Sequence, residues 1–227
     1  MSVMERAYRN LGFVLLGLVP IFVAGFWIPY LSQIPRFDSS ITAAVHVHAV
    51  LLFLWLGLLI IQPLAIRYRA FGLHRMLGKA SYVIMALIVP FAVLMIWKEY
   101  HEKIADGQTS TYALEAELLS AAQLLVTVAL YVLAVLRIRQ RDVPAHMRYM
   151  ISIALLLLPA GLSRTLGYWV DLKQSLSATI SLAVIDLCLA GLVILDSRRG
   201  YNPRPYVVAF LTYNATAVVW LAMGRPV

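Results

Sequence analysis

The residues of this chain best suited to chemistry are histidines and charged groups that lie inside or beside long apolar runs. His46 and His48 lie at the start of one such run. Residues two apart on a helix point roughly 200° apart, so only one of the two can face a given site. His48 recurs with Trp55 and Gln62 at intervals of seven, which places these three on one stripe. We expect the stripe to face the interior of a helix bundle, with His48 as a ligand or as a hydrogen-bonded structural residue.

A second polar stripe is expected further along the chain. Its members are spaced by three, three, four and four residues, which puts them on one face of a helix. Polar side chains in lipid need partners, so this face should look inward. The stripe either lines a ligand path or makes hydrogen bonds between helices, and its first residue also lies close enough to the membrane edge to be solvated. Its members are Glu117, Ser120, Gln123, Thr127 and Tyr131.

Arg164 and Asp186 are the two charged residues inside the apolar runs. A charge that faces lipid costs a few kcal/mol or more. The two residues belong to consecutive runs that would form antiparallel helices. We therefore expect them to pair, either as a structural ion pair or as a group that binds a ligand or relays protons.

Two short motifs place a histidine and an arginine just before an apolar run. They are His74-Arg75-Met76-Leu77-Gly78 and His146-Met147-Arg148-Tyr149-Met150, both expected in loops. A b-type haem takes neutral histidine as an axial ligand, and its propionates need basic groups nearby. The candidate haem ligands are thus His48, His74 and His146, with Arg75, Arg148 and Arg164 as propionate partners. The one cysteine, Cys188, and the histidine spacing predict no zinc or other metal site.

These motifs carry a resemblance to a known family. His46-x-His48, Trp55, Gln62 and His74-Arg75-x-Leu77-Gly78 resemble the first half of a family of bacterial multi-pass membrane proteins of unknown function. His146-x-Arg148-x-Met150 resembles the second hallmark of that family, and the resemblance covers about residues 40–170. It implies a multi-pass helix bundle. More distantly, histidines at both ends of antiparallel helices resemble b-type cytochromes and oxidase-assembly membrane proteins, which implies haem b.

Long apolar segments are the elements that would position all of these residues. Hydrophobic residues make up 62% of the 227-residue chain and charged residues 13%, with a mean hydropathy of +0.81. Soluble domains are about half apolar and a quarter charged, so this composition excludes that class. A membrane-spanning helix needs about 20 apolar residues. The sequence predicts an all-α polytopic bundle with spans at 11–30, 41–66, 81–97, 118–136, 149–170, 176–195 and 207–223.

The number of spans has one alternative, and the first span could also be compared with a signal peptide. The count is six if 207–223 lies in the membrane interface instead of crossing. The first apolar run is longer than the core of a signal peptide and ends at Trp27 and Tyr30 without a small-residue cleavage site. We therefore expect it to be a retained anchor.

Positive charge predicts the orientation. With seven spans, thirteen lysine and arginine residues fall on the side of the N-terminus and five on the other. Basic loops resist translocation, so the N-terminus is predicted to be cytoplasmic and the C-terminus external, in a bacterial inner membrane. The formal net charge of +8 is then explained by loops that meet anionic lipid. The basic residues are divided among short loops, so we expect a lipid bilayer as partner and no nucleic acid.

Three functions from different classes fit these features. The first is binding of haem b for redox or oxidase-assembly work. The second is a transporter or sensor for a small molecule or an ion, lined by the two polar stripes and by Arg164 and Asp186. The third is a non-catalytic scaffold for other membrane subunits. The sequence holds no phosphate-binding loop and no zinc-protease motif, and whether the protein is an enzyme stays open.

Overall fold

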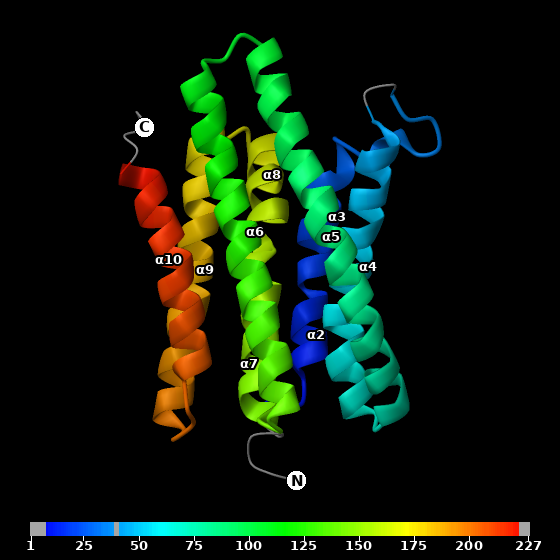
Figure 1. Cartoon of the computed structure of the whole chain (residues 1–227), viewed down its shortest axis with the longest axis vertical. Coiled ribbons are helices and arrows are strands. Elements are labelled where there is room, and N and C mark those ends of the chain that lie inside the picture. Colours follow the sequence, from blue (N-terminus) through cyan, green and yellow to red (C-terminus); the bar gives the residue numbers. More distant parts are fainter. Residues whose placement is uncertain (1–7, 39–40, 223–227) are drawn as a thin grey trace. The chain divides into compact units, whose positions relative to one another are not determined.

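The computed structural model describes residues 8–38 and 41–222, with the side chains of 112, 217 and 219–222 left aside. Among these described residues, every regular secondary-structure element is a helix. The chain divides into two compact units, Met1–Met95 and Ile96–Val227, and helix α5 runs from the first into the second. Figure 1 shows the helices along the chain. The all-α class expected from the sequence is therefore confirmed.

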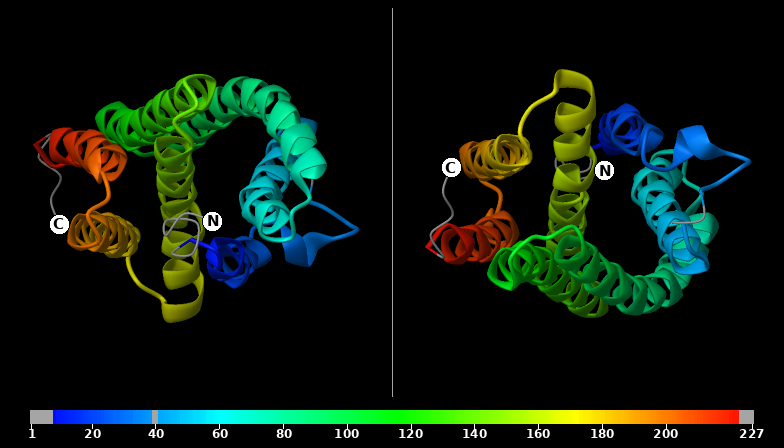
Figure 2. Two further views of the ribbon diagram at one scale, coloured as in Figure 1. Left: turned by 90° about the horizontal axis from the view of Figure 1, so that it is seen from below. Right: turned by 90° about the horizontal axis from the view of Figure 1, so that it is seen from above.

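The first unit is built on one long helix with shorter helices beside it. Helix α2 packs against α4, and Figure 2 shows α2 and α3 beside α4 from both ends. Gly12 makes this contact close, because a Cβ atom there would lie 2.5 Å from Cγ of Leu64. The elements of this unit are α2 (Leu11–Leu16), α3 (Leu18–Trp27), the 3-10 helix η1 (Leu31–Gln33), α4 (Ala43–Arg67) and the first part of α5 (Phe71–Ala105).

The second unit contains five further helices after the end of α5. Helix α6 packs on α7, α8 and α10 both pack on α9, and α10 also contacts α6 and α7. The core of this unit holds Ile153, Ile185 and Leu189, which are fully buried. The helices are α6 (Ser110–Arg139), α7 (Val143–Leu156), α8 (Leu158–Val170), α9 (Gln174–Arg198) and α10 (Arg204–Ala222).

Local residues explain where these helices begin and end. Asp142 caps α7, since its side chain accepts a hydrogen bond from the Ala145 N–H at 3.1 Å. Gly107 and Gly200 have positive φ angles, 81° and 70°, in the turns before α6 and after α9. Glycine adopts this conformation without strain. Asp171 closes α8 in the left-handed region, which aspartate tolerates better than most residues.

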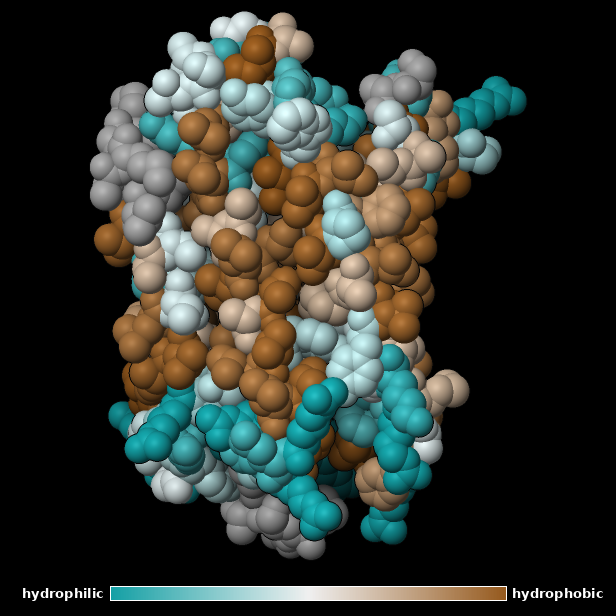
Figure 3. Space-filling view, in the orientation of Figure 1, coloured by the Kyte–Doolittle hydropathy of each residue, from teal (hydrophilic) through white to brown (hydrophobic). Residues whose placement is uncertain are grey.

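In the described part of the chain, five helical stretches are long and apolar enough to cross a membrane: Ala43–Arg67, Phe71–Ala105, Ala113–Arg139, Val143–Val170 and Gln174–Arg198. The stretch Val143–Val170 comprises α7 and α8. The apolar helix Leu11–Trp27 is shorter. Helix α10, Arg204–Ala222, covers the predicted window 207–223 except for the last residue of the window, which lies outside the described part. Figure 3 shows hydrophobic side chains along the middle of the helices that face the viewer and hydrophilic ones gathered at their lower ends. A multi-pass membrane protein is therefore supported, and the count of seven spans stays a prediction.

The structure corrects two predicted loops. His74 and Arg75 lie in the first turns of α5, and His146 and Arg148 lie in α7, where loops were expected. Helix α5 has 35 residues, or about 52 Å at 1.5 Å per residue, which exceeds the roughly 30 Å of a bilayer core. Hydropathy windows end where charged residues begin, but charged residues such as Lys and Glu are good helix formers. The helices therefore continue beyond the apolar windows.

Candidate functional site

The most distinctive polar group in the second unit is the carboxylate of Asp186, at the middle of α9. Twelve residues of α9 precede it and twelve follow, so it lies about 18 Å from either end. Its Oδ1 atom accepts a hydrogen bond from Nδ2 of Asn214 on α10 at 2.8 Å. Figure 2 shows α9 and α10 side by side in both views. The side chain of Asp186 is half-buried. The site is therefore an acid and an amide on adjacent helices.

The amide group of Asn214 is fixed in its orientation by a second acceptor. Nδ2 of Asn214 also donates to the carbonyl oxygen of Phe210 at 2.9 Å. A carbonyl oxygen only accepts hydrogen bonds, so the nitrogen of the amide must face it. Asn214 therefore presents N–H groups, and not its oxygen, to Asp186.

The predicted partner of Asp186 has a different contact. Arg164 lies 3.8 Å from Glu99, and its NH1 atom donates to the carbonyl oxygen of Ala160 at 2.9 Å. The expected pairing of Arg164 with Asp186 is thus replaced by two separate contacts. Among the described residues, the hydrogen-bond partner of Asp186 is the neutral Asn214, and no ion pair to Asp186 is found.

Tyr213 adds a third polar group to this region. It precedes Asn214 on α10 and its side chain is 1% exposed. In the part of the chain that the structure describes, its hydroxyl group has no hydrogen-bond partner. A buried hydroxyl without a partner costs about 1–3 kcal/mol. Such a group is a candidate contact for a bound species.

A buried ion pair lies at the other end of α9. Nε of Arg148 on α7 donates to Oδ2 of Asp196 at 2.5 Å, and the two side chains are 2% and 0% exposed. The guanidinium group also lies over the rings of Tyr201 and Tyr206, with its carbon 5.6 and 6.0 Å from their centroids. Arg148 was predicted to hold a haem propionate. In the structure its guanidinium group pairs with Asp196 instead.

Asp196 was not predicted as a site residue, because it lies one residue beyond the predicted membrane span 176–195. A signal was present, since Asp196 is an acid two residues before the basic pair Arg198 and Arg199.

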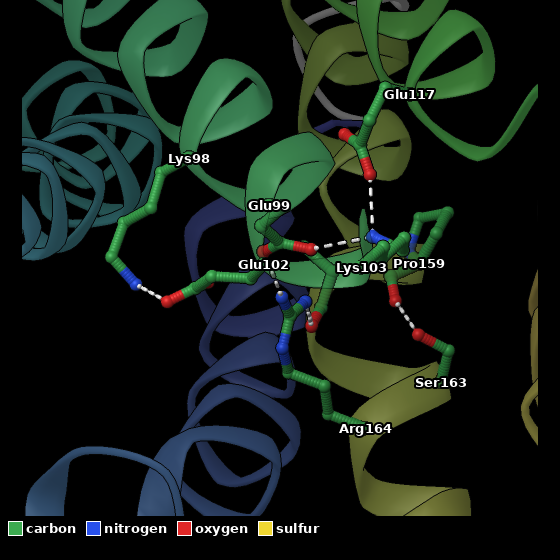
Figure 4. A network of polar contacts seen from close by, with 9 residues as sticks. Lys98, Glu99, Glu102, Lys103, Glu117, Pro159, Ser163 and Arg164 are labelled. Atoms are coloured by element: carbon green, nitrogen blue, oxygen red, sulfur yellow. Dashed lines mark hydrogen bonds and ion pairs between the residues drawn. The ribbon is translucent and has the colours of Figure 1, made fainter. Parts of the chain in front are cut away.

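A charged cluster lies where α5 ends and α6 begins. Figure 4 shows Lys103 pointing toward Glu117. Nζ of Lys103 lies 2.6 Å from Oε1 of Glu117 and 3.4 Å from Oε2 of Glu99. Glu99 also meets Arg164 of α8. A further pair, Lys98 with Glu102, is exposed. The cluster ties α5, α6 and α8 together at this end of the second unit.

The cluster lies beyond the apolar part of α5, which ends at Lys98. Burial alone would lower the pKa of Lys103, but the hydrogen bond to Glu117 and the charges of Glu99 and Glu117 outweigh it. The pKa of Lys103 is therefore raised above its ordinary value of 10.5. Lys103 stays charged at neutral pH and holds Glu117.

The predicted polar stripe of α6 is placed as follows. Glu117 and Tyr131 are buried, 6% and 7% exposed, and Gln123 is partly buried. Glu117 has Lys103 as its partner. This face of α6 is therefore covered by other parts of the protein at Glu117 and at Tyr131.

In the first unit, the structure brings His74 and Gln62 together. With the side-chain amide of Gln62 oriented to satisfy its neighbours, its nitrogen donates to Nδ1 of His74 and its oxygen accepts from the Gly78 N–H at 2.8 Å. Trp55 of the same stripe is 1% exposed, and His48 is partly buried. Because Nδ1 of His74 accepts, the proton of the neutral ring lies on Nε2. Arg75 is exposed.

His146 has the opposite tautomer. Its Nδ1 atom lies 2.9 Å from the carbonyl oxygen of Ala134, which can only accept, so Nδ1 carries the proton. Its Nε2 atom is then left as a base. This is the arrangement of histidines that bind a haem iron or another metal. Groups of three or more His, Cys, Asp or Glu side chains that could hold a metal ion are not found among the described residues.

These elements and polar groups define the class of the protein as a multi-pass α-helical membrane protein. No protein-family model, curated protein or solved structure matches the chain.

Proposed function

We propose that this chain is a cation transporter of a bacterial inner membrane, with Asp186 as its cation site. The observation that carries the proposal is the position of Asp186 at the middle of an apolar helix, with neutral Asn214 as its hydrogen-bond partner. An intramembrane ionisable residue typically marks an ion pathway or a proton relay.

The neighbouring charges explain why Asp186 differs from the other acids. Asp196, Glu117 and Glu99 each have a cationic partner within 4 Å. Their negative charge is compensated by the protein itself. Asp186 meets an amide instead, and an uncompensated carboxylate is costly in an apolar environment. Binding of a cation from solution supplies the missing charge, and its release to the other side completes transport.

The experiment is a flux assay in liposomes. Purified protein is reconstituted, a gradient of protons, Na⁺ or K⁺ is imposed, and the internal pH or cation content is followed with a dye. We expect flux with the wild-type chain and a loss of at least about tenfold in Asp186→Asn, which keeps the shape but removes the charge. Asp171→Asn is the matched control, because Asp171 is exposed and Asn tolerates its left-handed conformation equally well.

Two results would contradict the proposal. One is the absence of flux for all three cations, also when mixtures of small amines and carboxylic acids are added as co-substrates. The other is equal flux in the wild type and in Asp186→Asn.

A specific observation also favours a second candidate function, binding of haem b. His146 presents Nε2 as a base, because its Nδ1–H is held by the carbonyl oxygen of Ala134. The residues fit in part, since His74 has the other tautomer and Arg148 is committed to Asp196. A bound haem would supply one-electron chemistry, and His146 would hold its iron.

An absorbance spectrum tests this candidate. A purified sample with added haem should show a Soret band that shifts on reduction with dithionite. The band should be lost in His146→Ala and kept in His101→Ala, whose histidine is exposed near the end of α5. A colourless wild-type sample, or a band that survives in His146→Ala, would refute it.

A further inference from the structure

The atoms around Asp186 also identify the cation. We propose that Asp186 exchanges a proton and that the hydroxyl group of Tyr213 receives the hydrogen bond of the protonated acid. This inference rests on the proposed function of Asp186 as a cation site and names the substrate of that site.

The side chains that contact Asp186 favour a proton over a metal cation. Hard metal cations take about six or more oxygen ligands. Asp186 supplies a carboxylate, but Asn214 presents its amide nitrogen, which repels a cation. The described residues hold no cluster of three acidic or other metal-binding side chains. A proton needs one carboxylate oxygen and one acceptor for its hydrogen bond.

Tyr213 provides that acceptor. Its side chain is 1% exposed, and its hydroxyl group lacks a hydrogen-bond partner among the described residues. Tyr213 directly precedes Asn214, the hydrogen-bond partner of Asp186, on α10. The buried phenol is therefore on the same turn of α10 as the residue that contacts the carboxylate. When Asp186 takes up a proton it becomes an O–H donor, and the phenol oxygen can accept from it directly or through one water molecule.

Helices α7, α8 and α10 pack against α9 and carry other titratable groups, several of which have partners other than Asp186. Arg148 on α7 is held by Asp196, Arg164 on α8 by Glu99, and His146 on α7 by Ala134. The remaining titratable residues on these helices are Tyr149 on α7, Tyr168 on α8, and Arg204 and Tyr206 on α10. Tyr213 is thus the titratable residue of α10 that lies next to Asn214, the partner of Asp186.

Labelling with dicyclohexylcarbodiimide tests this inference on the purified full chain. The proton of a carboxylic acid moves to a carbodiimide nitrogen, the carboxylate oxygen attacks the central carbon, and the adduct rearranges to an N-acylurea without a leaving group. Only a protonated acid in an apolar site reacts in this way. We expect mass spectrometry to locate the adduct on Asp186, with labelling that falls as the pH rises. Asp186→Asn should remove it, and Asp171→Asn should leave it unchanged.

Added Na⁺ distinguishes a proton site from a site for a metal cation. If Asp186 binds a proton, Na⁺ at constant ionic strength leaves the labelling unchanged. Protection by Na⁺ would overturn the inference and leave the proposed transport function standing. Labelling without flux would contradict the proposed function while the proton site stood. No adduct on Asp186 at any pH where the protein is folded would overturn the inference.

The role of the tyrosine is tested with Tyr213→Phe. Removal of the phenol oxygen takes away the acceptor of the protonated state, so the labelling midpoint should fall by roughly 0.5 to 1 pH unit. Tyr206→Phe is the matched control on the same helix, because Tyr206 lies against Arg148 instead. A midpoint that moves equally in both variants, or in neither, would refute the role of Tyr213.

Discussion

Single residues differ here in how their charge is compensated. The guanidinium of Arg148 pairs with Asp196, donates to the carbonyl oxygen of Pro144 and lies over two tyrosine rings. Asp186 has one neutral hydrogen-bond partner, Asn214, in the described part of the chain. The first arrangement holds helices together. The second leaves a charge for which a bound cation is the natural complement.

The buried pair gives a prediction at this scale. Arg148→Ala should destabilise the protein by about 3–5 kcal/mol, because it leaves Asp196 buried without its cation. The double variant Arg148→Met with Asp196→Leu should recover most of this loss, since two apolar side chains of similar size replace both charges. Thermal unfolding in detergent measures both. A double variant less stable than Arg148→Ala would show that the pair itself is net stabilising.

Residue types could be found in the sequence, but their partners could not. Asp186 was identified because an acid interrupts an apolar run. Its pairing with Arg164 was predicted because the two residues lie on consecutive antiparallel runs, but in the structure Arg164 lies beside Glu99. Partner choice depends on helix rotation and on where a helix breaks. The turn at Leu157 that divides α7 from α8 is one such break, and a hydropathy window does not locate it.

At the scale of elements, close packing of α2 on α4 depends on Gly12. Gly12→Val should destabilise the first unit by about 1–3 kcal/mol, because its Cβ would lie 2.7 Å or less from two Leu64 carbons and 3.1 Å from the Ile60 carbonyl oxygen. Gly57→Ala is the control, since nothing lies within 4 Å of a Cβ at that position. Unfolding in detergent should show a loss only for the Gly12 variant. Equal melting temperatures would mean that Leu64 moves aside at no cost.

The tie between α5 and α6 predicts a pH dependence. Glu117→Gln should lower stability by about 1 kcal/mol at neutral pH, because Lys103 loses its main partner. The raised pKa of Lys103 means that this contribution is fully present below pH 10.5 and is lost as the pH rises through the raised value. The difference between wild type and variant should therefore shrink only above about pH 10.5.

An exposed pair on the same helix is the control for this tie. Glu102→Gln removes the partner of Lys98, but Glu102 is 52% exposed, so the change should be within about 0.5 kcal/mol. If Glu117→Gln and Glu102→Gln behave alike, the buried side of the cluster adds no stability.

At the scale of the whole molecule, the helix class was predictable and the helix lengths were not. Long apolar runs define helices in a membrane because every backbone group must bond within its own segment. Polar residues such as His74, Arg75 and His146 were assigned to loops, and the structure places them inside helices. The length of an apolar segment matches the thickness of the bilayer core, but it does not show where the helix ends. The predicted external C-terminus lies in residues 223–227, outside the described part.

The predicted topology is tested with reporter fusions. With seven spans and a cytoplasmic N-terminus, a reporter at Asp106 should be external and one at Arg141 cytoplasmic, because basic loops stay inside. A reporter at Gly224 should be external for seven spans and cytoplasmic for six. An external reporter at Arg141 would reverse the orientation.

The central claim is that Asp186 is an acid that takes up and releases a proton inside the membrane. Infrared difference spectroscopy between acidic and alkaline samples tests it most directly. We predict a protonated carboxyl band from an apolar site in the wild type, lost in Asp186→Asn and kept in Asp171→Asn. Identical difference spectra for the wild type and Asp186→Asn would contradict the account.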